Sequence, residues 1–293
     1  MTVNVHFGDC LPFIKTLKDN SIDMILTDPP YFLKNLDNNW SPINLQKKKS
    51  NSHIAKLPIG MKFDPKQGKK FRDFMYKLSQ ELYRVLKPGG FFISFSSVRL
   101  YHNMTSGIED AGFHIRDSIA WTFSVSQVKA FRQNHIIDKD KKLTDQEKEN
   151  LKEKLKNHRT PQLKSNFEMA CVAMKPIEGR FIDNIQKWGT GLIYIDPNSK
   201  FPLNVMRFEK PNAVERKDNP HPTVKPVALM ENLIDIFCPE NGTVLDPFLG
   251  SGTCLIAALN KKRNCIGAEI NKEYIDIIKK RANSIGYNFP QGI

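Results

Sequence analysis

The stretch Thr243-Val-Leu-Asp-Pro-Phe-Leu-Gly-Ser-Gly-Thr253 joins a short apolar strand to a helical pattern through a glycine turn. Gly250 and Gly252 carry no Cβ atom, so the backbone can turn sharply there and approach a ligand closely. The helix expected after the turn presents free backbone N–H groups and a partial positive charge, which suit a carboxylate or a phosphate. Taken alone, a strand followed by G-x-G also fits an ordinary tight turn.

The next strand, Cys265-Ile-Gly-Ala-Glu-Ile270, ends in an acid, and Glu269 lies 17 residues after Gly252. An acid at the end of a second strand can accept hydrogen bonds from both ribose hydroxyls of a nucleoside cofactor. The alternative is an acid that only stabilises the N-terminus of the following helix. The glycine turn and the acid together predict a nucleoside site.

The second notable turn, Asp28-Pro-Pro-Tyr31, follows the apolar strand Ile22–Thr27. Two consecutive prolines fix φ and remove two N–H donors, so the turn is rigid and its carbonyls point outward. A carboxylate, a stiff carbonyl and an aromatic face suit a planar ring that bears an –NH2 group. Asp28 and the Pro29 carbonyl can each accept one amino hydrogen, and Tyr31 can stack on the ring. As a bare string of four residues, the motif also fits a simple turn.

Short apolar runs alternate with helical patterns along the rest of the chain. Strands are expected at Val3–Phe7, Ile22–Thr27, Phe91–Ser96, Ser118–Phe123, Met169–Met174, Thr243–Asp246 and Asn264–Ala268. Helices are expected at Phe71–Leu86, Val227–Phe237, Thr253–Leu259 and Lys272–Ala282. This alternation predicts an α/β fold with a mostly parallel sheet and helices on both faces.

The composition narrows the class of protein and its surroundings. The five cysteines are odd in number and form no C-x-x-C pair, which indicates reduced thiols in a cytoplasm and argues against a zinc site. No run of ~18 apolar residues is present, and the N-terminus does not resemble a secretory signal. The net charge of +13 favours a polyanionic partner, although many basic proteins bind no nucleic acid.

The positive charge is concentrated in one segment. Phe32 to Arg72 holds ten Lys/Arg and two acids, which is +8 of the +13, and it shows no sustained period. We therefore interpret it as a long basic loop. A second polar stretch, Gln133 to Ser165, contains the capping box Thr144-x-x-Glu147 and predicts a short exposed helix. A solvated insertion is the alternative reading of that helix.

Three motifs together resemble those of amino-methylating DNA methyltransferases. They are Asp28-Pro-Pro-Tyr31, His221-Pro-Thr-Val-Lys-Pro226 and Asp246-Pro-Phe-Leu-Gly-Ser-Gly252, and their order is that of the β group of this family. Gly8-Asp9-Cys10 resembles the family segment that contacts the cofactor adenine, and Leu86-Lys-Pro-Gly-Gly90 resembles its helix-to-strand turn. The similarity covers Met1 to Tyr31, Phe71 to Phe123, Phe167 to Pro176 and His221 to Tyr287.

The resemblance implies a single catalytic domain over residues 1–293 with a circularly permuted, Rossmann-like methyltransferase fold. In that fold Thr243–Asp246 lies beside Ile22–Thr27, at the point where the sheet changes its direction of winding and ligands bind. The termini then fall between the strands Asn264–Ala268 and Val3–Phe7. Residues 32–70 become a basic loop that faces DNA. Residues 127–165 and 177–220 become variable inserts and candidates for target recognition.

The resemblance also implies the reaction. A methyl group would pass from S-adenosylmethionine to the exocyclic amino group of adenine (N6) in duplex DNA, by direct displacement on a flipped base, with S-adenosylhomocysteine as product and no metal. The implied catalytic residues are Asp28, Pro29, Pro30 and Tyr31. The implied cofactor residues are Asp9, Cys10, Thr223, Lys225, Asp246, Phe248, Gly250, Ser251, Gly252, Thr253 and Glu269, and among them Thr223 and Lys225 would hold the methionine carboxylate. The candidate DNA contacts are Lys47, Lys48 and Lys49.

Several alternatives stay open. The target could be the N4 amino group of cytosine or a protein glutamine, and the chain could instead be a catalytically silent DNA-binding or cofactor-sensing module. Double-stranded DNA is the expected partner, with no membrane. A homodimer and a cognate restriction endonuclease are further partners that the sequence does not decide.

Overall fold

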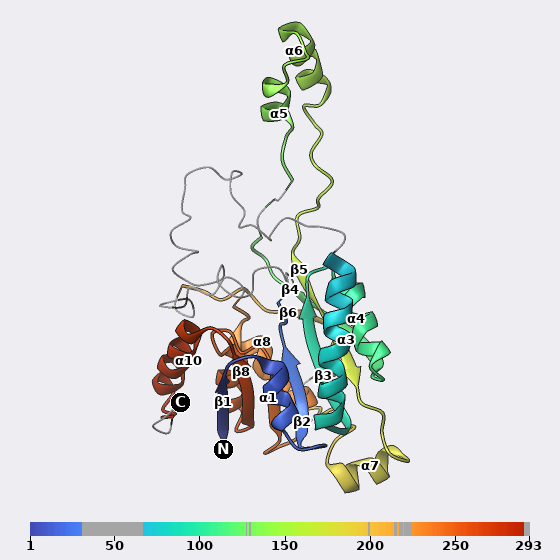
Figure 1. The fold of residues 1–293 in the computed structure, drawn as a ribbon, viewed down its shortest axis with the longest axis vertical. Coiled ribbons are helices and arrows are strands. Elements are labelled where there is room, and N and C mark those ends of the chain that lie inside the picture. Colours follow the sequence, from blue (N-terminus) through green and yellow to red (C-terminus); the bar gives the residue numbers. More distant parts are fainter. Residues whose placement is uncertain are drawn as a thin grey trace.

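A single eight-stranded sheet runs through the molecule (Figure 1). The computed structural model describes residues 1–30, 67–126, 128, 130–198, 200–213, 216, 219 and 224–289. The strand order is β1-β8-β7-β2-β3-β5-β4-β6. The strands are β1 (Val3–Phe7), β2 (Ile22–Thr27), β3 (Leu86–Ser96), β4 (His114–Thr122), β5 (Phe167–Met174), β6 (Val205–Arg207), β7 (Thr243–Asp246) and β8 (Asn264–Glu269). Only β5 runs antiparallel to its neighbours β3 and β4, so the predicted mostly parallel sheet is confirmed.

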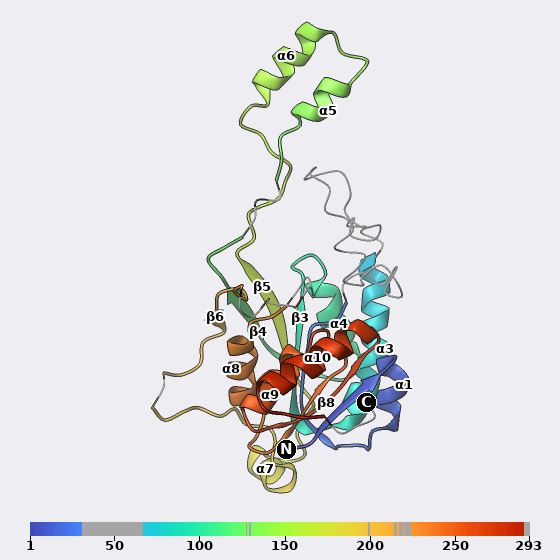
Figure 2. The same ribbon diagram turned by 90° about the vertical axis from the view of Figure 1, so that its left-hand side faces the viewer.

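Helices cover both faces of this sheet, as predicted (Figures 1 and 2). One face carries α1 (Cys10–Thr16), α3 (Gln67–Val85) and α4 (Tyr101–Asp110). The other carries α8 (Val227–Phe237), α9 (Thr253–Asn260) and α10 (Lys272–Ser284). Each face has its own apolar core, because successive side chains of a strand point to opposite sides. In β2, Met24 and Leu26 join the core under α8 and α9, whereas Ile22 and Ile25 join the core under α3.

The centre of the sheet brings together the two ends of the sequence. β2 pairs with β7 through Met24 and Val244, and β1 pairs with β8 through Val3 and Cys265. Both neighbour relations are those expected for the permuted arrangement. Since β1, β2, β7 and β8 are parallel, their carboxyl ends meet at one edge, where ligands of such sheets bind.

Several boundaries differ from the sequence-based expectation. β3 begins at Leu86 and not at Phe91, because the segment expected as a turn continues the strand: Gly89 N–H donates to the Lys175 carbonyl (2.9 Å) and Lys175 N–H donates to the Gly90 carbonyl (3.0 Å). α3 begins at Gln67, so residues 67–70, expected to end the basic loop, form its first turn. The rest of that loop lies outside the described residues. The elements that were not predicted are α1, α4, α5 (Asn134–Lys139), α7 (Phe181–Trp188) and β6.

A helical arm projects from the carboxyl edge of the sheet, between the end of β4 and the start of β5 (Figure 2). It carries α5 and α6 (Asp145–Lys154) at its tip. Thr144 and Glu147 form the predicted capping box, and no residue of α6 is buried, so the predicted short exposed helix is confirmed. Close to these helices, Phe131 and Thr160 are joined by two hydrogen bonds of 3.1 Å. These bonds hold the two chain segments that lead to the helices side by side.

No helix in the described part of the chain combines the length and the apolarity that crossing a bilayer would require.

A candidate cofactor and catalytic site at the carboxyl edge of the sheet

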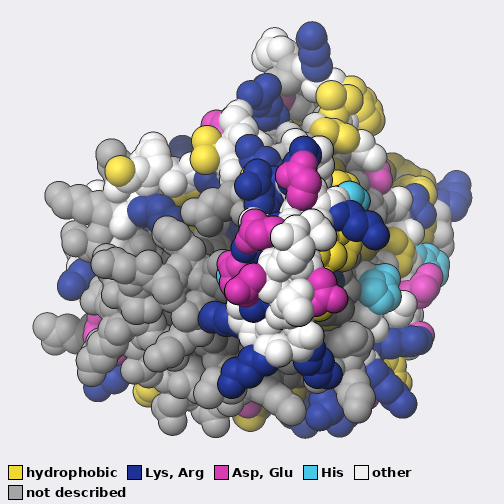
Figure 3. Space-filling model, turned by 90° about the horizontal axis from the view of Figure 1, so that it is seen from above, with side chains coloured by type: hydrophobic (Ala, Val, Ile, Leu, Met, Phe, Trp, Pro, Cys, Tyr) yellow, Lys and Arg dark blue, Asp and Glu magenta, His cyan; other side chains and the backbone are white. Residues whose placement is uncertain are grey.

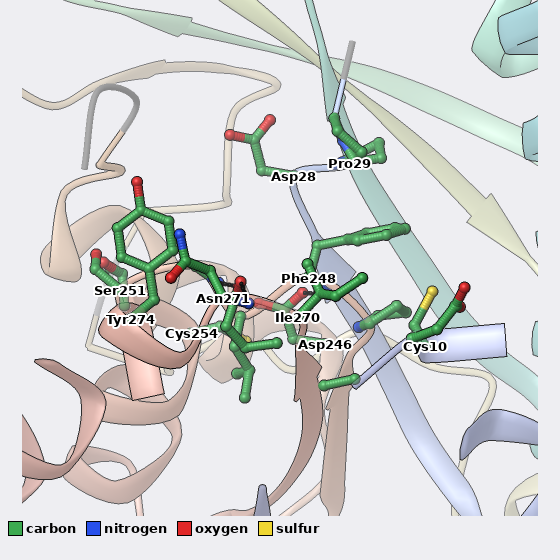
Figure 4. Close-up of a pocket in the computed structure, with 18 of the residues that line it drawn as sticks. Cys10, Asp28, Pro29, Asp246, Phe248, Ser251, Cys254, Ile270, Asn271 and Tyr274 are labelled. Atoms are coloured by element: carbon green, nitrogen blue, oxygen red, sulfur yellow. Dashed lines mark hydrogen bonds between the residues drawn. The ribbon is translucent and has the colours of Figure 1, made fainter. Parts of the chain in front are cut away.

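A cavity of about 260 Å³ lies where the carboxyl ends of β1, β2, β7 and β8 meet. Figure 4 shows Asp28 and Pro29 at one side of this cavity, with Phe248 beneath them. The described site residues that line it are Asp9, Cys10, Asp28, Pro29, Pro30, Lys225, Asp246, Phe248, Gly250, Ser251, Thr253 and Glu269. Segments distant in the sequence, predicted to share one site, therefore border one cavity.

The glycine turn after β7 has the geometry that its sequence indicates. Gly250 and Gly252 have φ values of 53° and 82°, in the left-handed region that favours glycine. Gly252 is the N-cap of α9, and a Cβ atom there would lie only 2.8 Å from Cγ1 of Ile278. The turn therefore depends on glycine for both its backbone conformation and its packing against α10.

Glu269 ends β8 and ties two loops together. Its Oε2 accepts a hydrogen bond from Gly250 N–H (2.8 Å), and its Oε1 accepts one from Asn271 N–H (2.8 Å). Burial raises the pKa of Glu269 to about 7, although these backbone hydrogen bonds act to lower it. Asn271 is the N-cap of α10, so Glu269 does contact a helix start as in the alternative reading. Because each carboxylate oxygen has two lone pairs, acceptor sites remain for a ligand at the cavity.

Asp246 ends β7 and is buried at the seam with β2. Its Oδ1 accepts hydrogen bonds from Thr27 Oγ1 (2.7 Å) and from Phe248 N–H (3.0 Å). Burial raises the pKa of Asp246 to about 7, against the effect of these hydrogen bonds. Asp246 thus fastens the glycine turn to the end of the strand that leads to Asp28.

The segment after β1 closes the cavity on another side. Gly8 N–H donates to the Glu269 carbonyl (3.0 Å), and Asp9 is the N-cap of α1, accepting from Leu11 N–H at 2.8 Å. Burial, reinforced by the charge of Asp9, raises the pKa of Cys10 to about 12. The Cys10 thiol is therefore protonated at neutral pH and contributes a packing surface and not a thiolate nucleophile.

The buried Lys225 and the partly exposed Asp28 form an ion pair beside the cavity. The Lys225 ammonium donates to Asp28 Oδ2 and lies 3.5 Å from Glu168 Oε2. Lys225 directly precedes Pro226, which is the N-cap of α8. The family resemblance implied that Lys225 binds the methionine carboxylate of the cofactor. In the structure its ammonium instead contacts two carboxylates of the chain itself. Sequence reasoning gave Glu168 no role, because nothing near it in the sequence marks it.

Some predicted site residues cannot be placed. Tyr31, Thr223 and Lys47, Lys48 and Lys49 lie outside the described residues.

Other residues join the site without having been predicted. Thr27, Phe74, Asn271 and Tyr274 contact the site residues or line the cavity. Of these, only Asn271 had a local signal, since an Asn just before a helical pattern is a common N-cap. Among the described residues, no group of three His, Cys, Asp or Glu side chains is arranged to hold a metal ion.

Solved structures with the same fold include a complex with SAM and a DNA methyltransferase. A complex of M1.HpyAVI with SAM matches with a TM-score of 0.59 and 24% identity, over 96% of this chain and all of that one. The PvuII DNA methyltransferase, described as cytosine-N4-specific, matches with a TM-score of 0.60 and 16% identity, over 100% of this chain and 88% of that one. These likenesses confirm the expected methyltransferase fold.

Curated relatives align with nearly the whole chain. The type II methyltransferase M.HpaI of Haemophilus parainfluenzae is 28% identical over 94% of this chain and 73% of its own length. The type II methyltransferase M.HindIII of Haemophilus influenzae is 26% identical over 94% of both chains. The family model described as DNA methylase, of the N6/N4 class, matches residues 22–280. The chain therefore belongs to this DNA methylase family, the N6/N4 class of S-adenosylmethionine-dependent DNA methyltransferases.

Proposed function

We propose that this chain transfers a methyl group from S-adenosylmethionine to the N6 amino group of an adenine that is flipped out of duplex DNA. One observation carries the proposal: the Asp28-Pro29-Pro30 turn and the turn holding Gly250 and Gly252 border the same cavity. When bound, S-adenosylmethionine supplies a sulfonium methyl group that a nitrogen can take by direct displacement. The residues of the chain then have two tasks, which are to hold the cofactor and to present the amino group.

The cavity has the chemistry that a nucleoside cofactor needs. Glu269 lines it and offers acceptors to the two ribose hydroxyls. Phe248 and Ile270 line it with apolar surface suited to an adenine ring. The turn at Gly250 approaches closely because it has no side chain. Asp9, Ser251 and Thr253 add polar groups around the same cavity.

Asp28 and Pro29 would act on the amino group. The lone pair of an aromatic amine is delocalised into the ring, so the amine is a poor nucleophile. Acceptors at the Asp28 carboxylate and the Pro29 carbonyl favour a pyramidal nitrogen and stabilise the positive charge that develops on it. A base inside a duplex is out of reach of such a pocket, so it must be flipped out, and Tyr31, the residue after Pro30 in the sequence, would stack on it.

DNA would be held by the basic and variable segments. Residues 32–66 directly follow Tyr31 in the sequence, and Lys47, Lys48 and Lys49 among them are the expected phosphate contacts. The arm within residues 127–165 carries several Lys and Arg side chains on its exposed surface (Figure 3). We assign it, with residues 177–220, to target recognition.

The further partners and the cellular location are proposed from the names of the curated relatives and from exposed side chains of the chain. The curated relatives are named type II methyltransferases from bacteria, which supports a cognate restriction endonuclease and a bacterial cytoplasm. All five cysteines are free, which supports the proposal of reduced surroundings. Exposed apolar side chains in the segment around β6, such as Phe201, Leu203 and Val205, support a homodimer, which sedimentation of the purified chain tests.

Asp28→Ala tests the proposed chemistry. Loss of an acceptor aimed at a developing charge costs roughly 3 kcal/mol, so methyl transfer to DNA should fall at least about 100-fold. S-adenosylhomocysteine binding, measured by calorimetry, should stay nearly unchanged. Asp73→Ala, on the exposed face of α3, is the matched control and should leave both unchanged.

The product identifies the target base. Hydrolysis and mass analysis of DNA methylated by the wild-type chain should yield N6-methyladenine. N4-methylcytosine in its place would move the assignment to cytosine, and cofactor binding with no methylated base in any DNA would favour the silent module. If Asp28→Ala keeps more than about a tenth of wild-type turnover, its assigned role is wrong.

A further inference from the structure

Lys225 is held where three strands and a helix start converge. Its side chain is only 5% exposed. The ammonium donates to Asp28, which follows β2, and lies 3.5 Å from Glu168 Oε2 on β5. It also lies 5.1 Å from the centroid of the Phe95 ring on β3. Each of these contacts fixes the position of the ammonium against Asp28.

The charge state of this cluster follows from its partners. Burial alone would lower the pKa of Lys225, but the Asp28 and Glu168 carboxylates more than offset it and raise the pKa above the ordinary value. The ammonium is therefore charged. A buried charge is stable only when it is paired, so removal of Lys225 would leave Asp28 with an unbalanced negative charge in a poorly solvated place.

A cation beside the acceptor has a cost for the reaction, because positive charge develops on the amino nitrogen. Glu168 offsets that cost. With two carboxylates and one ammonium, Asp28, Glu168 and Lys225 together carry a formal charge of −1. A site with this sign stabilises a developing cation, while the ammonium keeps the Asp28 carboxylate in one orientation.

We propose that Lys225 is a positioning residue for Asp28, with Glu168 as the balancing charge, and that it does not bind the carboxylate of the cofactor. The proposal rests on the proposed function, because it assumes that Asp28 accepts the amino hydrogens. It differs from the role that the family resemblance gave to Lys225. The two roles differ in what they predict for cofactor binding and for turnover.

Lys225→Met in the full chain separates these roles, since methionine keeps the unbranched stem of the side chain and removes the charged terminal group. We expect turnover on DNA to fall about 30-fold or more, as for loss of preorganisation at a catalytic acceptor. We expect the S-adenosylhomocysteine dissociation constant, measured by calorimetry, to stay within about threefold of the wild type. A cofactor affinity at least about tenfold weaker, with turnover at saturating cofactor nearly kept, would overturn the proposal.

A double-mutant cycle tests whether Lys225 acts through Asp28. In an Asp28→Asn background the neutral amide no longer needs the ammonium, so adding Lys225→Met should change the residual turnover by less than about threefold. Full additivity of the two losses would contradict the proposal. Glu168→Gln should lower turnover about three- to tenfold without changing S-adenosylhomocysteine affinity, and an unchanged turnover would remove Glu168 from the cluster.

Lys175→Met is the matched control, because Lys175 is also a buried lysine but donates to Asn20, Tyr83 and Leu86 away from the cavity. It should lower the unfolding temperature and leave turnover of the folded protein unchanged. If Lys225→Met does not fold, the same measurements are made on Lys225→Gln and on the Asp28→Asn, Lys225→Met double variant. Methylation of DNA by the wild type is measured first, and its absence would contradict the proposed function. If the wild type is active and Lys225→Met is equally active, only the role inferred for Lys225 is contradicted.

Discussion

At the scale of single residues, two carboxyl groups of the cavity titrate near neutral pH. Burial raises the pKa of both Asp246 and Glu269 to about 7. A ribose hydroxyl that donates to Glu269 prefers its ionised form, because the protonated acid has lost acceptor capacity. Binding of the cofactor is therefore linked to loss of a proton from Glu269.

This linkage predicts how cofactor affinity depends on pH. Below pH 7 Glu269 is mostly protonated, so binding must first release that proton; above pH 7 it is ionised already. Affinity for S-adenosylhomocysteine should therefore rise about three- to tenfold from pH 6 to pH 8 and then level off. Calorimetry at pH 6, 7 and 8 on the wild type and on Glu269→Gln measures it. The variant should bind more weakly with a flatter pH dependence, and an equally steep dependence in Glu269→Gln would assign the titration to another group.

The role of a residue could be predicted from the sequence where that role depends on its immediate neighbours in the chain. Gly250, Gly252 and Asp28 are marked by their immediate neighbours, because a glycine turn and a diproline turn are local structures. The pairing of Lys225 with Asp28 and Glu168 has no local signal. It arises only when β5 packs beside β3 and brings Glu168 to the ammonium.

At the scale of elements, α7 is fastened to the start of β3 by one buried side chain. Asn184 is fully buried, and its Nδ2 donates to the carbonyls of Pro88 (3.0 Å) and Thr190 (2.8 Å). Its Oδ1 accepts from Glu178 N–H (2.9 Å). The amide thus pairs with three backbone groups, and of these only the Pro88 carbonyl has a second partner among the described residues, Thr190 Oγ1 (2.6 Å).

Asn184→Ala should accordingly lower the free energy of unfolding by about 2–4 kcal/mol, since buried polar groups are left without partners. Urea denaturation measures the change. Gln186→Ala, on the exposed side of the same helix, should stay within about 0.5 kcal/mol of the wild type. Equal effects of the two substitutions would mean that the Asn184 bonds add nothing to stability.

The same region shows why some elements escaped prediction. Pro88, Gly89 and Gly90 are typical turn residues, and the sequence therefore indicated a turn before β3. In the structure, hydrogen bonds with Lys175 carry the strand through them. By contrast, β2, β7 and α8 were predicted to the residue, because their apolar runs and flanking turn residues lie within the elements themselves.

At the scale of the whole molecule, the tip of the arm projects away from the sheet, so we expect that it can be removed without disturbing the rest of the fold. Figure 2 shows α5 and α6 well away from the sheet, and the bonds between Phe131 and Thr160 keep the two chain segments that lead to these helices adjacent. Its exposed helix was predictable from the capping box at Thr144. Its projection from the sheet was not, because that depends on how β4 and β5 direct the chain outward.

Replacement of residues 132–159 by a short Gly/Ser linker tests the role of the arm. The body should keep its unfolding temperature and its affinity for S-adenosylhomocysteine. If the arm contacts phosphates, DNA affinity should fall and the slope of log affinity against log salt should flatten by roughly one to three units. Lys47, Lys48 and Lys49→Ala provides the comparison for the basic loop, with a similar flattening expected. An unchanged slope in the linker variant would leave the arm as a solvated insertion.

The strand order also has a consequence for synthesis on the ribosome. β1 and β2 are made first, yet β8 and β7, which lie between them, are made last. The edge of β2 that pairs with β7 therefore stays open in the nascent chain until β7 and β8 emerge and insert, and such long-range pairing is slow. Because the cavity needs residues from β1 and β2 as well as from β7 and β8, the polypeptide acquires its catalytic centre only after β8 has been translated, and a product that stops before β7 would be inert.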